Sequence, residues 1–348
     1  MTLAEADRPE TVAKPRPRFS PKVEPYPLRL PAGKSFGPVI AVTRGLTGDL
    51  YVLHQPNWQL GPGDDIADRL GPVARFSPSG EFIEAWGGDD HVPAVDGVSQ
   101  WPAGNDGLDC DGEGNLWLFG WAEGDGAVLK FSPTGELLLR IGQRGRIGDD
   151  DDTQFLDRPT SCYHNIKTRE VFVSDGYGNH RVIAFNSDTG AFTRMWGAYG
   201  KKPSTVSEDE TYGSPVHKVA AGPDGHIYVC DRLKGRVQEF ELIPGGARFL
   251  REAVIAPGTG SHGSAFDLVF THDGKFILVA DGSNNRVWTI DLASFAVLGW
   301  VSTKPAWEGE DNRPAEQGLL HRFAIEPNGD LLLACTYGLR LMKYVGLG

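Results

Sequence analysis

An internal repeat with a period of roughly 50–65 residues constrains the fold of this chain more than any other feature. Six segments share an apolar stretch, a polar turn such as "PDG" or "PNG", and a second apolar stretch. The predicted second strands of these segments begin at Leu50, Leu116, Val171, Ile227, Phe276 and Leu331. Such near-constant spacing indicates a repeat architecture rather than two unrelated domains.

Most of these strand pairs are followed by two more stretches of alternating apolar and polar residues, joined by turns such as "SPSG", "SPTG" and "SDTG". Four antiparallel strands, repeated six times, predict an all-β six-bladed β-propeller. We expect one propeller domain over residues 26–348 and an extended or disordered N-terminal arm over residues 1–25. The sixth repeat lacks a fourth strand of its own, so we expect residues 26–31 to complete that blade.

The charge balance narrows the range of partners. The chain has 348 residues, with 34 Lys and Arg against 46 Asp and Glu, a formal net charge of −12. This balance argues against nucleic acid and anionic membranes and favours a small-molecule substrate. The N-terminal segment has charges and prolines where a secretory signal needs an apolar run, so we expect a cytoplasmic protein. The arm could dock on a second copy of the chain, giving a homo-oligomer.

The cysteines do not form a redox or metal motif. Cys110, Cys162, Cys230 and Cys335 are far apart and include no CxxC pair. We interpret them as reduced, structural residues, with a disulfide as the alternative.

Candidate metal ligands lie at the start of alternate inner strands. Asn105 and Asp106 precede the inner strand of repeat two, His217 that of repeat four, and His321 that of repeat six. In a six-bladed propeller these residues approach the central channel about 120° apart, which suits three ligands of one divalent metal. Imidazole and carboxylate ligands suit zinc, iron or manganese. The alternative is that each histidine caps a strand or holds a loop.

The turn "SDGYGNHR" between the second and third strands of repeat three contains reactive side chains that chain reversal does not require. Gly176 and Gly178 are expected to allow the positive φ of a tight turn, but they do not explain Tyr177. An Asp-to-Arg span recurs in three such turns, which predicts a structural role at each, either a salt bridge or a backbone clamp. Arg232, in the equivalent turn of repeat four, is also not needed for the turn. His54 and His180 end neighbouring segments on the same face.

These residues carry a resemblance to a known family. The stretch from "RPTSCYHN" to "TRMWG" and the following "SPVHKVAAGPDGHIYVCDRLKGRVQEF" resemble repeats of the peptidyl-α-hydroxyglycine α-amidating lyases, within the NHL-repeat propellers. The resemblance implies a channel metal, usually zinc, held by three histidines, and cleavage of a carbinolamide to an amide and glyoxylate. It assigns the role of base to Tyr177, substrate binding to Arg232, and metal binding to His217 and His321.

Three positions depart from the family pattern. Asp106 replaces the first histidine ligand, which adds negative charge and widens the metal choice to iron, manganese or calcium. Gln55 replaces an arginine and cannot clamp a carboxylate in the same way. Arg322 occupies a position that helps to hold a structural calcium, so we expect that calcium to be absent.

We therefore predict a metal-dependent lyase-like enzyme in which the metal polarises a hydroxyl or carbonyl oxygen of a small substrate. Tyr177 is expected to act as acid or base, with its pKa lowered by Arg232 and the cation. The predicted metal ligands are Asp106, His217 and His321, with zinc the expected ion. The predicted substrate contacts are Gln55, His54, Asn105, His180 and Phe266. The alternatives are a metal-dependent lactonase, because "HDGKFILVADGSNNRVW" resembles gluconolactonase-like propellers, and a non-catalytic NHL scaffold that binds peptide, protein or RNA.

Overall fold

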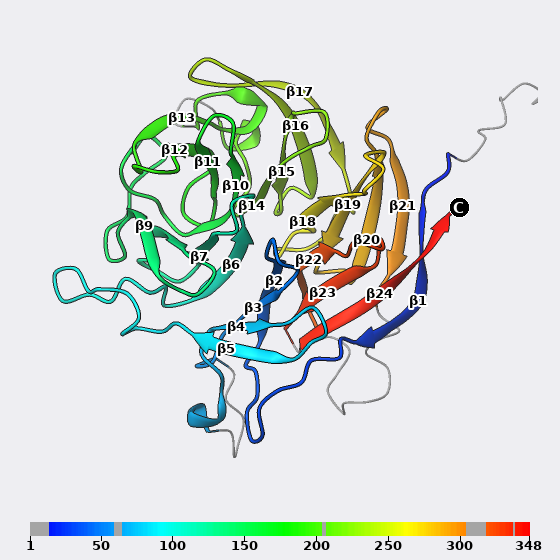
Figure 1. Ribbon diagram of the computed structural model, residues 1–348. Coiled ribbons are helices and arrows are strands. Elements are labelled where there is room, and N and C mark those ends of the chain that lie inside the picture. The colour runs from blue at the N-terminus through cyan, green and yellow to red at the C-terminus, as the bar shows by residue number, and fades with distance from the viewer. Residues whose placement is uncertain (1–13, 59–64, 204–206, 304–317, 337) are drawn as a thin grey trace, which may run out of the picture.

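The computed structural model describes residues 14–58, 65–203, 207–303, 318–336 and 338–348. In these ranges, six antiparallel sheets of four strands each are arranged radially around a central channel (Figure 1). The predicted six-bladed β-propeller is confirmed.

The first five blades each run from an inner strand at the channel to an outer strand at the rim, in chain order. Blade one comprises β2 (Val39–Arg44), β3 (Leu50–His54), β4 (Val73–Phe76) and β5 (Phe82–Trp86). Blade two comprises β6 (Asn105–Cys110), β7 (Leu116–Gly120), β8 (Ala127–Phe131) and β9 (Leu137–Gly142). Blade three comprises β10 (Pro159–Asn165), β11 (Glu170–Asp175), β12 (Arg181–Asn186) and β13 (Phe192–Trp196). Blade four comprises β14 (Val216–Ala221), β15 (Ile227–Asp231), β16 (Arg236–Ile243) and β17 (Gly246–Val254). Blade five comprises β18 (Ala265–Phe270), β19 (Phe276–Asp281), β20 (Arg286–Asp291) and β21 (Val297–Ser302).

Blade six combines both ends of the chain. It comprises β22 (Leu320–Ile325), β23 (Leu331–Cys335) and β24 (Gly338–Leu347), and β1 (Pro17–Pro25) forms its outer strand. The missing fourth strand is therefore supplied by the N-terminal segment, but by residues 17–25 instead of the expected 26–31. These residues belong to the propeller and not to an arm, whereas residues 1–13 lie outside the described residues.

The repeat pattern located the strands closely because it reflects local turn chemistry. Five of the six predicted second strands begin at the observed residue, and the sixth, β11, begins one residue earlier, at Glu170. Glycines in the inner hairpins adopt the left-handed conformation that reverses the chain, for example Gly114 (φ 88°) and Gly225 (φ 83°).

The hydrophobic core lies between the blades. Six clusters of buried side chains fill the six interfaces, including the interface between blades six and one that closes the ring. Tryptophans contribute to several of these layers, as Trp101 does between blades one and two and Trp196 does between blades three and four. Each blade is therefore stabilised mainly by its two neighbours, which fixes the relative positions of the inner strands.

Every inner strand has a β-bulge at its second residue. The register with the second strand shifts at this point in all six blades. The six bulged residues are Ile40, Asp106, Thr160, His217, Phe266 and His321. Because a bulge redirects the side chain of its extra residue, these six positions form one equivalent set around the channel mouth.

The described cysteines are unpaired, as predicted, and three of the four are buried. Three short 3-10 turns of three residues each lie in the described part of the chain: η1 (Ile66–Asp68), η2 (Ala198–Gly200) and η4 (Glu208–Glu210). None of them has the length or the apolar character to cross a membrane.

Candidate metal centre

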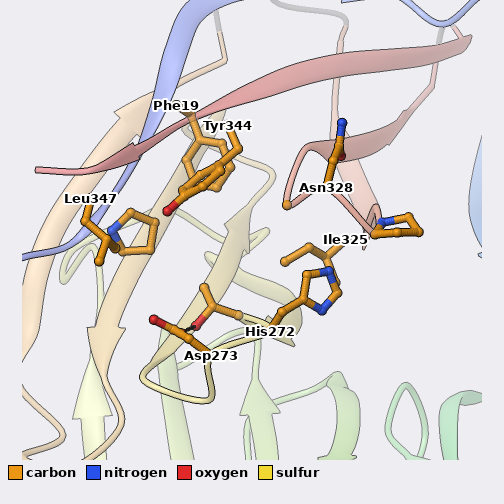
Figure 2. Close-up of a pocket in the computed structure, with 11 residues that line it drawn as sticks. Phe19, His272, Asp273, Ile325, Asn328, Tyr344 and Leu347 are labelled. Carbon is orange, nitrogen blue, oxygen red and sulfur yellow. Dashed lines mark hydrogen bonds between the residues drawn. The ribbon is translucent and has the colours of Figure 1, made fainter.

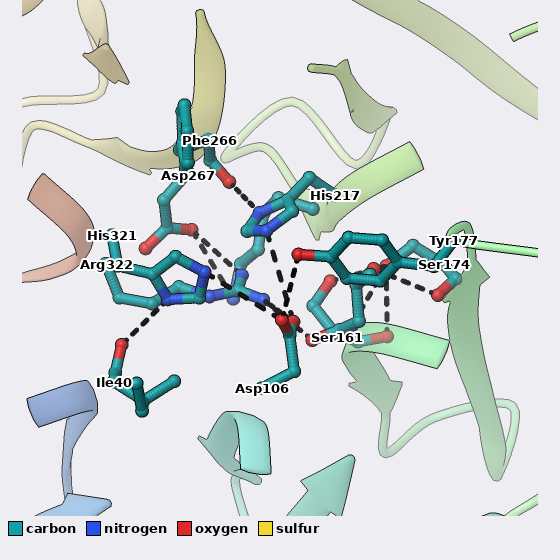
Figure 3. Close-up of polar contacts among 12 residues, drawn as sticks. Ile40, Asp106, Ser161, Ser174, Tyr177, His217, Phe266, Asp267, His321 and Arg322 are labelled. Atoms are coloured by element: carbon teal, nitrogen blue, oxygen red, sulfur yellow. Dashed lines mark hydrogen bonds and ion pairs between the residues drawn. The ribbon is translucent and has the colours of Figure 1, made fainter. Parts of the chain in front are cut away.

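The bulges of blades two, four and six bring three ligand-type side chains together at the channel mouth. Asp106, His217 and His321 each offer one ligand atom, and these atoms lie within 4.8 Å of one another (Figure 3). All three residues are buried. The sequence placed them on alternate blades, and the shared bulge explains why they converge.

A backbone carbonyl of the next blade orients each histidine. Nδ1 of His217 lies 2.5 Å from the carbonyl oxygen of Phe266 in blade five, and Nδ1 of His321 lies 2.9 Å from that of Ile40 in blade one. Since a carbonyl oxygen only accepts, each Nδ1 must carry the proton and donate it. Each Nε2 is then left with a lone pair. Burial holds the pKa of both imidazoles well below the usual range, so both rings stay neutral.

Asp106 faces both imidazoles. Its Oδ2 lies 4.0 Å from Nε2 of His217, and its Oδ1 lies 3.8 Å from Nε2 of His321. Its Oδ1 accepts a hydrogen bond from the Tyr177 hydroxyl (3.2 Å), and its Oδ2 accepts one from Nη2 of Arg322 (3.4 Å). Burial raises the pKa of Asp106 to about 6, although Arg322 and Arg232 oppose this shift.

These residues fit a bound cation. Nε2 of His217 is a buried nitrogen with no hydrogen-bond partner, and it faces a carboxylate oxygen across a gap longer than a hydrogen bond. A lone pair that faces a carboxylate without a hydrogen between them is unfavourable in a buried site, because neither group can donate. A divalent metal would satisfy all three atoms, and two imidazoles with one carboxylate are ligands that zinc, iron and manganese accept.

Tyr177 projects into this site from the turn between β11 and β12. Its flanking glycines do not have the positive φ that we expected. They are needed for space: a Cβ on Gly176 would lie 2.0 Å from the carbonyl oxygen of Val216, and one on Gly178 would lie 1.9 Å from the Asp157 carboxyl carbon. Ser214 Oγ also donates a hydrogen bond to the Tyr177 carbonyl oxygen (2.8 Å). The turn is therefore packed tightly against blade four, which fixes the direction of the phenol.

The protonation of Tyr177 differs from the expectation. Burial and the Asp106 carboxylate raise the pKa of the phenol, and the opposing effect of Arg232 is smaller. Arg232 alone therefore does not lower this pKa, and the phenol is a proton donor to Asp106 in the metal-free site.

Arg232 and Phe266 form one side of the site. Nη1 of Arg232 donates to the Tyr177 hydroxyl (3.0 Å), and Nε donates to the carbonyl oxygen of His262 (2.7 Å). The guanidinium lies 4.0 Å from the centre of the Phe266 ring, which also contacts His217 edge-on. The structure thus brings both predicted residues next to the candidate ligands.

The other predicted substrate contacts have structural partners. Both ring nitrogens of His54 are engaged by backbone groups of Gly37 (3.1 Å) and Gly71 (3.0 Å), so this histidine joins the segments that precede β2 and β4. Gln55 Nε2 donates to the Asn105 carbonyl oxygen (3.0 Å), while Asn105 Nδ2 donates to the His54 carbonyl oxygen (3.0 Å). These two hydrogen bonds join blades one and two beside Asp106.

His180 is not part of the cluster either. Its Nδ1 lies 3.1 Å from the Asp150 carboxylate, and its backbone N–H donates to the same group (2.6 Å). This hydrogen bond raises the pKa of the imidazole. His180 therefore joins the turn that carries Tyr177 to the preceding loop.

A charged layer below the ligands was not predicted. Arg322 lies between Asp106 and Asp267, with Nη1 3.7 Å from Asp267 Oδ1. Lys218 lies 2.6 Å from Asp109 and 3.8 Å from Asp267. Arg322, Lys218 and Asp267 each directly follow a bulged residue, which is a sequence signal that the alternate-blade pattern could have revealed. These buried cations are therefore paired with carboxylates directly beside Asp106.

The recurring Asp-to-Arg spans are salt bridges in two of the three turns. Asp175 pairs with Arg181 (2.9 Å), and Asp231 pairs with Arg236 (2.9 Å). In blade five, Asp281 instead accepts from Asn284 and Trp288, and Arg286 stacks on Trp300. Asp281 also accepts from the backbone N–H of Asn284 (3.1 Å), so the third turn has the predicted backbone clamp in place of a salt bridge.

Other ligand-type groups and a pocket lie on the opposite face. Two sets of ligand-type residues lie at inner hairpins there: Asp111, Glu113 and His164, and Asp224, His226 and Glu239. In the second set His226 pairs with Glu239 (2.6 Å). In the first set Nε2 of His164 bonds to the Ser187 hydroxyl (2.9 Å), whereas Nδ1 lies 3.5 Å from Asp111 without a hydrogen bond. A pocket lined by Phe19, Ile325, Tyr344 and Leu347 lies where β1 and β24 close the ring (Figure 2). His272 beside it is bonded to the Glu326 carbonyl oxygen (2.7 Å).

Comparison with curated proteins supports the resemblance inferred from the sequence. The chain is 33% identical over 138 residues to the mouse peptidyl-glycine alpha-amidating monooxygenase, and 34% identical over 139 residues to the rat enzyme. The chain resembles the amidating enzymes in sequence. The match covers 39% of this chain and 13% of each of those proteins. No family model matches the chain.

Solved structures share the fold. Virginiamycin B lyase from Staphylococcus aureus superposes with a TM-score of 0.55 at 10% identity, covering 94% of this chain and 100% of that chain. The periplasmic gluconolactonase of Pseudomonas aeruginosa superposes with a TM-score of 0.52 at 18% identity, covering 88% of this chain and 84% of that chain. At these identities the likeness concerns the propeller fold alone.

Proposed function

We propose that the chain is a metal-dependent lyase-like enzyme that acts on a small hydroxylated or carbonyl-containing substrate at the channel mouth. The observation that carries this proposal is the convergence of three lone-pair atoms, from Asp106, His217 and His321, in which Nε2 of His217 is buried without a hydrogen-bond partner. The partial sequence similarity to amidating enzymes supports the reaction class.

A bound divalent cation would stabilise negative charge on a substrate oxygen, and zinc is the ion we expect. Asp106, His217 and His321 would hold the cation. Arg232 would bind a substrate carboxylate, because its guanidinium is a fixed donor beside the Tyr177 hydroxyl. Phe266 supports that guanidinium from the other side.

Tyr177 would move the proton. In a carbinolamide, loss of the hydroxyl proton lets a carbon–oxygen double bond form while the carbon–nitrogen bond breaks, and the departing amide nitrogen gains a proton. The phenol is suitably placed for both transfers because its oxygen lies 3.2 Å from Asp106 and 3.0 Å from Arg232. To accept a proton, Tyr177 would first have to lose its own, and burial and the Asp106 carboxylate oppose that loss by raising the pKa of the phenol.

Elemental analysis and a defined substrate probe test the proposal together. Purified protein should contain about one equivalent of metal, and a His217→Ala, His321→Ala double variant should lose it while remaining folded. With N-benzoyl-α-hydroxyglycine, the native protein should release benzamide and glyoxylate. Tyr177→Phe should keep the metal but reduce the rate by about 100-fold or more. A metal-free native protein, or full activity in Tyr177→Phe, would contradict the proposed mechanism.

A metal-dependent lactonase is the second candidate. Oδ1 of Asn105 is buried without a hydrogen-bond partner, and Asn105 directly precedes Asp106 in β6, so an amide oxygen is available close to the site. A lactonase should open a simple δ-lactone with loss of metal-dependent activity in Asn105→Ala, and should tolerate Tyr177→Phe. The cytoplasmic location and the formation of a homo-oligomer remain predictions from the sequence.

A further inference from the structure

Two tryptophans are exposed beside the candidate metal centre. Trp58, in the segment after β3, is 41% exposed, and Trp121, directly after β7, is 38% exposed. Their ring centroids are 6.2 Å apart with a tilt of 50°, so the two side chains contact each other across blades one and two. Both segments lie on the same face of the propeller as Tyr177, because all of them follow the second strand of a blade.

The backbone places this pair close to Asp106. The Trp121 N–H donates to the Gly104 carbonyl oxygen (2.8 Å), and Gly104 precedes Asp106 by only two residues, at most about 7 Å along the chain. A Cβ on Gly104 would lie 2.7 Å from Nε1 of Trp121, so the indole lies directly over this glycine. Trp58 is tied to the same region, because its N–H bonds to the Gln55 carbonyl oxygen (3.4 Å) and the Gln55 amide bonds to Asn105.

The loop under Trp121 is held firmly. Asp125 is buried and accepts hydrogen bonds from the backbone N–H groups of Ala103, Gly104 and Ala122. This carboxylate fastens the segment before Asp106 to the segment that carries Trp121. The exposed indole is therefore fixed relative to the candidate ligands, at a site where two large aromatic rings remain open to solvent.

We infer that Trp58 and Trp121 form an apolar subsite for the substrate, and that the substrate is a small molecule in which an aromatic or bulky apolar group is joined to the reacting polar group. Arg232 and Tyr177 are linked by a hydrogen bond, and Tyr177 is linked to Asp106 by another. Trp58, Trp121, Tyr177 and Arg232 follow the second strands of blades one, two, three and four, so they lie in consecutive blades on one face. A ligand that met Arg232 with its carboxylate and extended across these blades would reach the tryptophans. Pockets that combine a few polar groups with aromatic walls commonly bind such ligands. This inference rests on the proposed function for the position of the reacting group.

Two inert probes isolate the contribution of the apolar group. N-benzoylglycine and N-acetylglycine have the same amide and carboxylate groups. The first has a phenyl ring on the amide carbonyl where the second has a methyl group. By calorimetry, the native protein should bind the benzoyl probe about ten times more tightly. A Trp58→Ala, Trp121→Ala double variant should bring the two affinities within about twofold, while the affinity for the acetyl probe stays unchanged. Trp58→Ala alone should lose part of the preference for the benzoyl probe. This single variant tests the subsite even if the removal of Trp121 prevents folding.

Trp300 provides the matched control, because it is 43% exposed but lies on the outer strand β21. Trp300→Ala should retain the full preference for the benzoyl probe. Equal affinities in the native protein, no binding of either probe, or a preference that survives the double substitution would each overturn the inference. Binding is measured without turnover, so the two proposals can fail separately. A metal-free protein that still binds the benzoyl probe more tightly than the acetyl probe would contradict the proposed metal-dependent lyase and would support the apolar subsite.

Discussion

Blades two, four and six differ from blades one, three and five at one equivalent backbone position. The even blades place Asp106, His217 and His321 at the bulge of the inner strand, whereas the odd blades place Ile40, Thr160 and Phe266 there. The odd blades contribute carbonyl oxygens instead: those of Phe266 and Ile40 orient the two histidines, and that of Thr160 accepts from Arg322 (2.7 Å). One backbone feature therefore positions the candidate ligands in half of the blades, and in the other half it positions carbonyl oxygens, two of which orient the histidines.

The largest expected difference between even and odd blades is the effect of a substitution at the bulge on zinc affinity. His217→Ala is expected to lower the affinity for zinc about a thousandfold, equivalent to about 4 kcal/mol, because one of three protein ligands is lost. Phe266→Leu at the equivalent position of blade five keeps the carbonyl that orients His217, so its affinity should stay within about threefold of the native value. Competition with a chromogenic chelator measures both. Similar losses in both variants would show that the odd blades do more than orient the ligands.

The junction between blades three and four should be nearly as sensitive. A methyl group on Gly176 would collide with the carbonyl oxygen of Val216, which is next to His217. Gly176→Ala is expected to reduce the free energy of unfolding by about 3 kcal/mol and to displace Tyr177. Gly260→Ala is the control, because a Cβ there meets no atom within 4 Å. Urea unfolding distinguishes them, and a native-like stability for Gly176→Ala would refute the tight contact.

The blade-one histidine should respond to pH without taking part in metal binding. Burial lowers the pKa of His54 to about 4, whereas an exposed imidazole in the unfolded chain has a pKa of about 6.5. The unfolded state therefore binds more protons in this window, and the stability present above pH 6.5 is lost as the pH falls towards 4. Between pH 7 and pH 5 this loss should be about 2 kcal/mol from His54 alone.

A His54→Gln variant should show a smaller drop between these pH values by about the same amount in urea unfolding. It should also keep the metal content of the native protein. An unchanged pH dependence would mean that His54 does not titrate on unfolding as its buried position requires.

The smallest effect is expected at Thr160, the bulged residue of blade three. Its hydroxyl lies 2.7 Å from both the Ser174 hydroxyl and the Val216 carbonyl oxygen. Thr160→Val should cost about 1 kcal/mol of stability through these lost hydrogen bonds and should leave zinc affinity unchanged. Thr160→Ser, which keeps the hydroxyl, should be closer to the native stability in the same urea measurement. A marked loss of zinc in Thr160→Val would remove the distinction between even and odd blades.

The sequence determined the strands, the six blades and the identity of the converging residues. Alternating apolar residues and glycine turns act over a few residues, so the repeat predicted five of the six second-strand starts, and its symmetry placed Asp106, His217 and His321 on alternate blades. Tyr177 stood out for the same local reason, because nothing in its turn required a phenol.

Only the tertiary structure decided how these residues are held. His321 is oriented by the carbonyl of Ile40, 281 positions away in the chain, and β1 closes blade six with a register that no local pattern specifies. The hydrogen-bond partners of His54 were likewise not predictable from the sequence, because they are backbone groups of Gly37 and Gly71. These outcomes depend on contacts between segments far apart in the chain, and such contacts are set by the packing of blade against blade.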